Sequence, residues 1–514
     1  MRAVFCAAHL VFAGTLAHGD VTLTSPEGGL EISGPLLSYD GQYYRVDTIY
    51  GPLTVDGTGV TCAGDPCPDL TAFVAEITIS GAASMGEVLL PSLVEAFARR
   101  QAFTVRRTDA AADETTFELQ ARGTNRTVLR ITFHATRSDE SFADLVTGDA
   151  DIAFSLREVR AAEVALAQDA GLGNLGASGR SRIVALDAMV PLVASDAQVS
   201  SISLDDLVAV VAGDITNWAD LGGSARPINL HLLSDTSGPM QAFADRVLTP
   251  ADASAASSAT RHRDAAALAA AVSADPNALG LGLYSMPGTA VALPLAGSCG
   301  FINRAEPLSI KTEDYPLAMP IFLYLAARRF PPVVQDFLNE FDSPGSAIVI
   351  RRIGFVENRI TSVSLDAQGE RLANAIAASG PEIGVPALKS LVQALRGTER
   401  LSIAFRFEGG TADLDTPSRA NIRILAEEIA RGRFDGRTLI FAGFSDSEGP
   451  AGANQRLAQA RAGTVRDAVQ NAARLRQGNA PRLSVVGFGE AMPVACNADA
   501  WGRTANRRVE VWIK

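Results

Sequence analysis

The feature that most constrains the fold of this chain is a repeated strand–turn–helix pattern between about residues 76 and 350. The segment "AEITISGAASMGEVLLPSLVEAFARR" starts with alternating apolar residues, passes through small residues and continues with helical spacing. The segments "VLRITFHATRSDESFADLVTGDADIAFSLREV" and "PINLHLLSDTSGPMQAFADRVL" repeat this order. Alternating strands and helices are typical of parallel sheets, whose ligand clefts lie at the carboxyl ends of the strands. The pattern therefore predicts an α/β body with a ligand cleft.

Five pieces of this body follow the order of a known family. They are "ISGAASMGEVLLPSLVEAF", "GDADIAFSLR", "VAGDITNWADLGG", "SDTSG" and "YPLAMPIFLYL". They resemble the phosphate-binding branch of the type II periplasmic solute-binding proteins. The resemblance implies a two-lobed fold over residues 76–350, with lobes of about 76–183 plus 306–350 and 184–305. A hinge crossed twice would let the lobes grip a ligand between them.

The same resemblance suggests which residues would hold an anion. In that family, amides at helix N-termini and hydroxyl groups surround the bound oxyanion, which is sound physics for an anion site. Matched by position, the candidate solute-binding residues here are Ser84, Ser138, Ser237 and Gly238. The alternative is that these serines only cap their own helices.

Other positions depart from the phosphate-binding pattern. The departures are Leu233 for the binding arginine, Leu156 for the aspartate, Asp139 and Glu140 for glycines, and Pro239, which removes an amide donor. Two carboxylates at the expected site would repel phosphate, so we expect weak phosphate binding or none. Arg137 or Arg157 would restore positive charge unless both are solvated surface residues.

The C-terminal stretch "GFSDSEGPAGANQRLAQARA", residues 443–462, places an acid and an arginine close to one another. A strand ends near Asp446, and a helix begins near Asn454. In that helix Leu457, Arg461, Val465 and Ala468 fall on one stripe, which predicts that they face the core. A buried arginine needs a partner, because an isolated buried charge costs several kcal/mol.

Residues 399–514 resemble the OmpA-like peptidoglycan-binding domain, through "GFSD", "LAQARA" and the terminal "NRRVEVWI". The resemblance implies an α+β domain of the β-α-β-α-β-β type that binds the diaminopimelate side chain of the wall peptide. By the family pattern, Asp446 takes the ammonium of that side chain and Arg461 its carboxylate. Asn454 and Arg507 would line the same pocket. The alternative is a plain internal salt bridge between Asp446 and Arg461.

The N-terminal sequence "MRAVFCAAHLVFAGTLAHGD" is typical of a secretory signal peptide over residues 1–19. The alternative is a buried N-terminal helix. Residues 20–75 alternate apolar and polar residues between turn signals, which predicts a small β module. Residues 351–398 carry short helical patterns with breaks and are interpreted as a partly folded connector. No later stretch is apolar and long enough to span a membrane.

Four cysteines remain after residue 19: Cys62, Cys67, Cys299 and Cys496. An exported chain experiences an oxidising compartment. "CAGDPC" closes a short loop, so a Cys62–Cys67 disulfide is expected. Cys299 and Cys496 are then either bonded across domains or both free. No histidine lies at ligand spacing near them, so we expect no metal site.

The net charge of −12 argues against nucleic acid as a main partner. We find no nucleophile–base–orienter set and expect neither catalysis nor a cofactor. The sequence therefore predicts a non-enzymatic protein of a Gram-negative periplasm, anchored to peptidoglycan and presenting a domain for a small solute or anion. Two alternatives stay open: an oxyanion-binding component of an ABC transporter, and a purely structural envelope protein.

Overall fold

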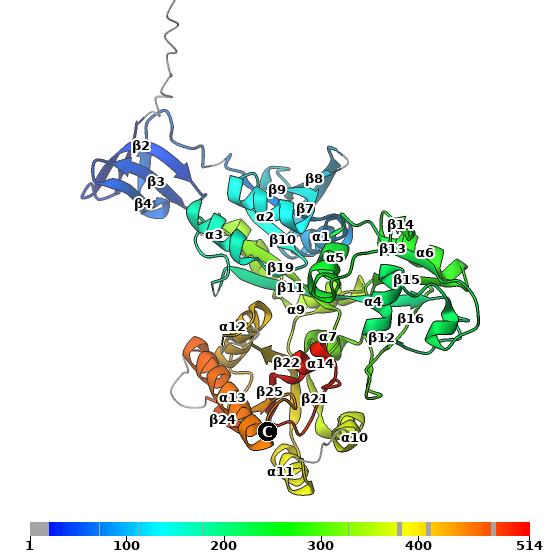
Figure 1. Cartoon of the computed structure of the whole chain (residues 1–514). Coiled ribbons are helices and arrows are strands. Elements are labelled where there is room, and N and C mark those ends of the chain that lie inside the picture. The colour runs from blue at the N-terminus through cyan, green and yellow to red at the C-terminus, as the bar shows by residue number, and fades with distance from the viewer. Residues whose placement is uncertain are drawn as a thin grey trace, which may run out of the picture.

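The computed structural model describes residues 20–70, 72–111, 113–177, 179–326, 328–377, 383–407, 413–473 and 480–514. The expected signal peptide, residues 1–19, lies outside these residues. Figure 1 shows a small N-terminal module, a two-lobed body and a C-terminal domain below both lobes. Within the described residues, no helix is both long and apolar enough to cross a membrane.

The N-terminal module is an antiparallel sheet in the order β4-β3-β2-β1-β5. Its strands are β1 (Asp20–Thr24), β2 (Glu31–Tyr39), β3 (Tyr43–Thr48), β4 (Gly51–Asp56) and β5 (Thr61–Ala63). A small core around Tyr44 and Val46 holds it together. Cys62 and Cys67 are bonded, with their Cα atoms 5.9 Å apart, as expected. Such a small core benefits from a covalent link.

The first lobe of the body is built on strands in the order β19-β10-β6-β9-β8-β7. Their bounds are β6 (Ala75–Ala82), β7 (Phe103–Asp109), β8 (Glu114–Ala121), β9 (Thr127–Thr136), β10 (Ile152–Ser155) and β19 (Ala318–Leu325). Its helices are α1 (Leu90–Arg100), α2 (Ser138–Thr147), α3 (Ala161–Asp169), α8 (Pro332–Glu340) and α9 (Pro344–Arg352). In α1, Leu90, Leu93, Val94 and Phe97 are buried at helical spacing. The parallel prediction holds for β10-β6-β9, whereas β7 and β8 pair antiparallel.

The second lobe contains the parallel strands β13 (Asn229–Leu233), β14 (Thr260–His262) and β15 (Ala278–Leu283). Its helices are α4 (Leu204–Ala212), α5 (Gly238–Phe243) and α6 (Ala265–Ala274). Short strands complete it: β12 (Ile202–Ser203), β16 (Val291–Ala292), β17 (Leu295–Ala296) and β18 (Ile302–Asn303). Its helices and strands alternate as the sequence pattern predicts.

One strand joins the two lobes. The strand β11 (Ser181–Val193) pairs with β19 up to Ala188 and with β15 from Met189 onward. It is buried along nearly its whole length, as expected for a strand covered on both faces. The predicted lobe boundary at residues 183–184 therefore falls inside a continuous strand, and the chain changes lobe about five residues later. The short strand β20 (Val356–Glu357) also pairs with β11.

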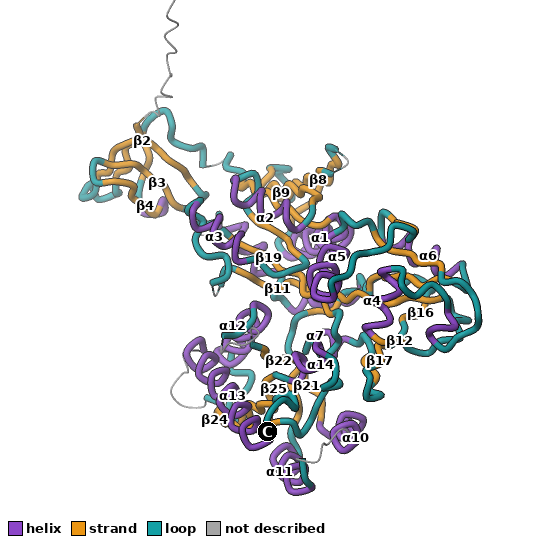
Figure 2. Tube along the Cα trace, viewed as in Figure 1, coloured by secondary structure: helices purple, strands orange, loops and turns teal. Residues whose placement is uncertain are grey.

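The C-terminal domain has a sheet in the order β21-β22-β25-β23-β24. The strands are β21 (Ser362–Ser364), β22 (Glu399–Arg406), β23 (Thr438–Phe444), β24 (Arg482–Gly489) and β25 (Arg508–Ile513). The helices α12 (Thr416–Ala430) and α13 (Ala451–Ala473) cover one face, and α14 (Ala500–Asn506) precedes the last strand (Figure 2). The predicted β-α-β-α-β-β order is present, with β21 and α14 added.

The interpretation of residues 351–398 as a partly folded connector is wrong for the part that the structure describes. The strand β21 extends the C-terminal sheet beside β22. The helices α10 (Gly369–Ala377) and α11 (Val385–Leu395) bury Ala375, and Leu391 with Leu395, in one cluster with Phe444 and Trp512, on the face opposite α12 and α13. These helices fold because the sheet offers a second apolar face to bury them.

The C-terminal domain is docked to both lobes. A disulfide joins Cys299 of the second lobe to Cys496, with Cα atoms 5.6 Å apart. This bond decides between the two alternatives for these cysteines. Asp314, which follows the short helix α7 (Pro307–Lys311), accepts from Arg400 at 2.9 Å. In the first lobe, Glu158 accepts from the Thr416 amide at 3.3 Å. The domain therefore contacts both sides of the hinge.

Candidate functional sites

In the C-terminal domain, the predicted peptidoglycan-binding residues gather at one edge of the sheet. Asp446 follows β23, Arg507 precedes β25, and α13 carries Asn454 and Arg461. Asp446 is buried, and its Oδ2 accepts from Arg507 Nη1 at 2.6 Å. No ion pair joins Asp446 to Arg461 among the described residues. The partner of the acid is therefore Arg507, not the arginine that the internal salt-bridge alternative assigns to it.

The guanidinium of Arg461 has one buried hydrogen-bond donor that no described residue pairs. Its Nη1 is buried and has no hydrogen-bond partner within the described residues. Its guanidinium carbon lies 5.3 Å from the centre of the Phe407 ring. Burial lowers the pKa of Arg461, the charge of Arg507 lowers it further, and Asp446 opposes both effects. The site thus holds a partly desolvated cation that forms no ion pair with an acid in the described part of the chain.

The predicted core stripe of α13 is displaced by about one residue. The buried residues are Asn454, Ala458, Ala462, Val465, Val469 and Ala473. Leu457, predicted to face the core, is 45% exposed. Small alanines lie on this stripe because the helix approaches the sheet closely: a Cβ on Gly443 would lie 1.9 Å from the Ala458 carbonyl oxygen. Arg461 borders the stripe, which accounts for its partial burial.

Asn454 positions the loop of this site instead of facing open space. Its Nδ2 donates to the Glu448 carbonyl at 3.0 Å and to Glu490 Oε1 at 2.7 Å. It also reaches the Asp446 carbonyl at 3.3 Å. Sequence reasoning missed Glu490 and Phe407. Glu490 directly follows β24, and β24 runs parallel to β23. Adjacent parallel strands end at the same edge of a sheet, so the position of Glu490 near Asp446 could have been predicted from the sequence.

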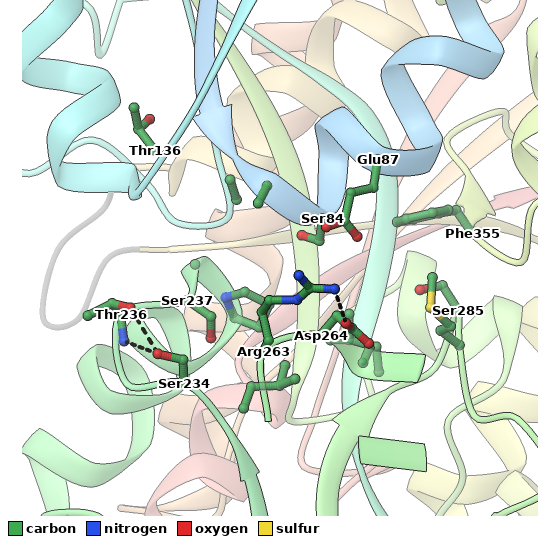
Figure 3. A pocket seen from close by; sticks show the side chains of 18 residues that line it. Ser84, Glu87, Thr136, Ser234, Thr236, Ser237, Arg263, Asp264, Ser285 and Phe355 are labelled. Carbon is green, nitrogen blue, oxygen red and sulfur yellow. Dashed lines mark hydrogen bonds and ion pairs between the residues drawn. The ribbon is translucent and has the colours of Figure 1, made fainter. Parts of the chain in front are cut away.

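In the body, a cavity of about 350 Å³ lies between the lobes (Figure 3). The predicted residues Ser84, Ser237 and Gly238 line it. Ser138 does not: it is 1% exposed, and its Oγ accepts from the Leu156 amide at 3.5 Å. The structure therefore brings three of the four candidates to one cavity and uses the fourth inside the first lobe.

An apolar contact occupies the turn where the resemblance implies an anion. A Cβ placed on Gly238 would lie 2.8 Å from Ala82 Cβ and 3.0 Å from Leu156 Cδ1. Leu156 is 3% exposed and belongs to the first lobe, whereas Gly238 begins α5 in the second. The leucine at the position of the family's aspartate thus closes this point by packing across the lobes.

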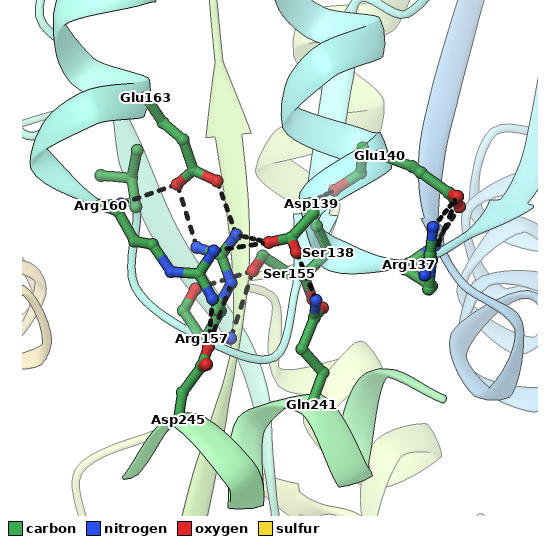
Figure 4. A network of polar contacts seen from close by, with 12 residues as sticks. Arg137, Ser138, Asp139, Glu140, Ser155, Arg157, Arg160, Glu163, Gln241 and Asp245 are labelled. Carbon is green, nitrogen blue, oxygen red and sulfur yellow. Dashed lines mark hydrogen bonds and ion pairs between the residues drawn. The ribbon is translucent and has the colours of Figure 1, made fainter. Parts of the chain in front are cut away.

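Beside this contact, charged side chains join the two lobes (Figure 4). We call the set formed by Asp139, Arg157, Arg160, Gln241 and Asp245 the interlobe network. Arg157, 4% exposed, pairs with Asp139 and lies 3.7 Å from Asp245 of the second lobe. Arg160 pairs with Asp139 at 2.9 Å and also with Asp245. Burial opposes ionisation of Asp139, but the two arginines outweigh it and lower its pKa.

The two carboxylates expected to repel an anion are therefore already neutralised. Gln241 Nε2 donates to Asp139 as well. Glu140 pairs with Arg137 at 2.5 Å. Arg157 is buried and paired, which excludes the solvated-surface alternative for it, and neither Arg137 nor Arg157 lines the cavity. Arg157 and Arg160 hold the lobes together, and Arg137 pairs within the first lobe, so none of them presents positive charge to the cavity.

Comparison with known families fits this architecture. A model described as PBP superfamily domain matches residues 64–344, more than half of the chain. The chain belongs to the PBP superfamily. An OmpA family model matches residues 406–507. The protein is thus a PBP-like body fused to an OmpA-like domain. The first implies a small solute or anion as ligand, and the second implies peptidoglycan binding and a place in the cell envelope.

Similar proteins cover one part each. Outer membrane porin F of Pseudomonas aeruginosa is 33% identical over 131 residues, which are 26% of this chain and 34% of that protein. Outer membrane protein Omp38 of Acinetobacter baumannii is 32% identical over 114 residues, 22% of this chain and 31% of that protein. The chain spans about a third of the length of these curated relatives.

Among solved structures, an ABC-type phosphate transport receptor from Vibrio cholerae has a TM-score of 0.41 and 17% identity, covering 55% of this chain and 99% of that one. PstS from Borrelia burgdorferi has a TM-score of 0.39 and 16% identity, covering 55% and 98%.

Proposed function

We propose that this PBP–OmpA protein is a non-enzymatic periplasmic protein of a Gram-negative bacterium. Its C-terminal domain anchors it non-covalently to peptidoglycan by binding the diaminopimelate side chain, and its body serves as a solute-binding unit. The observation that carries the proposal is the unpartnered, buried Nη1 of Arg461 beside the Asp446–Arg507 pair.

The free end of a diaminopimelate side chain carries one ammonium and one carboxylate. The carboxylate meets Arg461, whose open donor gains a charge-assisted hydrogen bond, worth roughly 1.5–3 kcal/mol. The ammonium meets Asp446. Arg507 keeps that carboxylate oriented and itself donates to Thr504 Oγ1 at 2.9 Å, which fixes its position. Both ligand charges thus find a partner in one partly desolvated site.

The second candidate, an oxyanion-binding component of a transporter, is favoured less. Leu156 of the first lobe packs against the turn at Gly238, where an anion would bind. Arg157 is already paired within the interlobe network. A wall anchor also restricts the diffusion that a carrier needs to reach its permease. The cavity of about 350 Å³ argues against a body that only braces the envelope, because it leaves room for a small ligand.

The direct test is sedimentation of the full chain with purified peptidoglycan. Wall material that contains diaminopimelate should retain the protein, and free meso-diaminopimelate should release it. Wall material with lysine at the same position lacks the second carboxylate and should retain at least about tenfold less, the factor that roughly 1.5 kcal/mol represents. Equal retention by both materials, or none by either, contradicts the proposal.

A further inference from the structure

The cavity between the lobes carries charges of opposite sign on opposite lobes. Glu87 comes from the first lobe, in the turn Met85–Leu89, and has no ion-pair partner in the described part of the chain. Arg263 comes from the second lobe, with a side chain 94% exposed and 3.4 Å from Asp264. Figure 3 shows both side chains reaching into the same space. The cavity thus presents Glu87 from one lobe, and Arg263 with its neighbour Asp264 from the other, to a ligand that lies between the lobes.

The charge balance of the lining is wrong for an oxyanion. Its charged residues are Glu87, Asp264 and Arg263, two carboxylates against one guanidinium. Asp264 Oδ1 also accepts from the Ala267 amide at 2.8 Å, so the first turn of α6 is already capped. Pro239, at the start of α5, has no amide hydrogen to offer. A phosphate dianion would therefore meet a lining of net negative charge.

The rest of the lining combines an apolar wall with the hydroxyl side chains of Ser84, Thr136, Ser234, Thr236, Ser237 and Ser285. Leu233, Leu283, Met286 and Phe355 form an apolar wall. Ser285 lines the cavity but donates its hydroxyl to Asp187 Oδ2 at 2.6 Å, so toward the ligand it offers lone pairs. The hydroxyl oxygens and an acid without an ion-pair partner in the described residues suit an ammonium group, and the apolar wall suits a hydrocarbon side chain. The volume lies near the lower end of small-molecule sites.

We infer that this cavity binds a small zwitterion, an α-amino acid with an apolar side chain, and not an oxyanion. Glu87 receives the ammonium, Arg263 the carboxylate, and the wall around Phe355 the side chain. The inference rests on the solute-binding role proposed for the body. The interlobe network sets the distance between the two charges, because it ties the lobes together without a ligand.

Calorimetric titration of the full chain tests this inference with L-leucine, L-methionine and L-phenylalanine as probes. At least one of these should bind. For leucine, 4-methylpentanoate lacks the ammonium and 3-methylbutylamine lacks the carboxylate. Each analogue should bind at least about tenfold more weakly, which corresponds to one lost charge-assisted bond of roughly 1.5 kcal/mol. Phosphate should give no heat.

Variants separate the two sites of the protein. Glu87→Gln should weaken amino-acid binding about tenfold and leave retention by the wall unchanged. Glu95→Gln, on the exposed face of α1 and outside the cavity, is the matched control. Arg461→Met should lose binding to peptidoglycan and retain the parent's affinity for the amino acid. No heat from any probe, equal affinity in Glu87→Gln, or phosphate binding tighter than the amino acids overturns the inference. Loss of amino-acid binding in Arg461→Met alone would place that ligand in the C-terminal site instead.

Discussion

Two regions of the molecule carry buried arginines next to acids, and they differ in what neutralises them. In the interlobe network, Arg157 is paired with Asp139 and also with Glu163 at 2.6 Å. In the C-terminal site, Arg461 forms no ion pair within the described residues and keeps a buried Nη1 without a partner, whereas Arg157 is ion-paired and lacks a hydrogen-bond partner only at Nε. A buried charge that the protein pairs internally contributes to structure, whereas one left open favours binding a ligand, because the open donor has already lost its water.

The core of the C-terminal domain extends the comparison to a third arginine cluster. Glu510 is fully buried and accepts from Arg508 Nε at 2.8 Å and from Arg371 Nη2 at 2.6 Å. Arg400 lies 3.3 Å away. Burial opposes ionisation of Glu510, but these arginines outweigh it and hold its pKa far below the usual value. Each arginine of this cluster has an acidic partner, so the cluster should respond to mutation as structure and not as a binding site.

The largest expected effect is therefore that of Glu510→Gln. It removes the carboxylate that pairs with Arg371, Arg400 and Arg508 and should lower the free energy of unfolding of the C-terminal domain by about 3–5 kcal/mol. Urea unfolding followed by tryptophan fluorescence measures this, since Trp512 Nε1 donates to Glu510 at 3.1 Å. Asp467→Asn, on an exposed pair of α13, should change stability by less than about 0.5 kcal/mol. A loss below about 1 kcal/mol in Glu510→Gln would contradict the structural role.

Arg461→Met should weaken ligand binding without lowering stability, the opposite of what Glu510→Gln should do. Affinity for a diaminopimelate muropeptide should fall by about 2–5 kcal/mol, or ~30-fold to several thousandfold. The free energy of unfolding should stay the same or rise, because an unpaired buried donor is replaced by an apolar chain. Fluorescence titration and urea unfolding of the same sample measure both. Arg482→Met, exposed at the far end of β24, is the matched control. Retained binding together with a marked stability loss would place Arg461 with the structural arginines.

Asp187 tests the hinge, where this buried acid has no cationic partner among the residues that the structure describes. It accepts from the Ser285 amide at 2.9 Å and from the Ala188 amide at 2.8 Å. Burial raises its pKa to about 6, although these hydrogen bonds oppose the shift. A raised folded-state pKa means that the folded state binds the proton more tightly. The stability that this proton supplies is complete below about pH 3.8 and is lost as the pH rises through about 6.

Asp187→Asn should remove that pH dependence, because the amide imitates the protonated acid. The shift of about two pKa units corresponds to about 3 kcal/mol, so the variant should exceed the parent in stability by up to this amount at pH 7 and match it near pH 4. Urea midpoints at both pH values give the difference. The control is Asp205→Asn, exposed in the first turn of α4, whose stability should depend on pH as that of the parent does. A constant offset between Asp187→Asn and the parent would show that Asp187 does not titrate in this range.

The sequence predicted the elements better than the partners of their side chains. The strand before Asp446 and the helix bearing Arg461 follow from local patterns and from a specific family motif. That Asp446 pairs with Arg507, 61 residues away, depends on which side chains reach across the sheet edge. Likewise, Asp139 looks repulsive in sequence, and only the packed lobes bring Arg157 and Arg160 to it.

The docking of the domains was beyond sequence reasoning for a related reason. Leu391 and Leu395 lie on a short amphipathic segment between breaks, and nothing local says which surface covers them. The Cys299–Cys496 bond joins residues 197 positions apart, so spacing left its pairing open. Long-range contacts of this kind depend on the shape of two folded units, which a pattern of neighbouring residues does not encode.

The smallest expected effect is that of phosphate, which should leave the free energy of unfolding unchanged. At 1 mM, a ligand with a micromolar dissociation constant would add about 4 kcal/mol to the free energy of unfolding. We expect less than about 0.3 kcal/mol, because Leu156 packs on Gly238 and Leu233 offers no charge. Thermal unfolding of the full chain with 1 mM phosphate, against 1 mM chloride, measures the shift. A stabilisation of several kcal/mol would mean that the lobes separate at Leu156 and expose donors that the closed form hides. The cleft would then resemble the C-terminal site, and the contrast between paired and open arginines would fail as a guide to ligand binding.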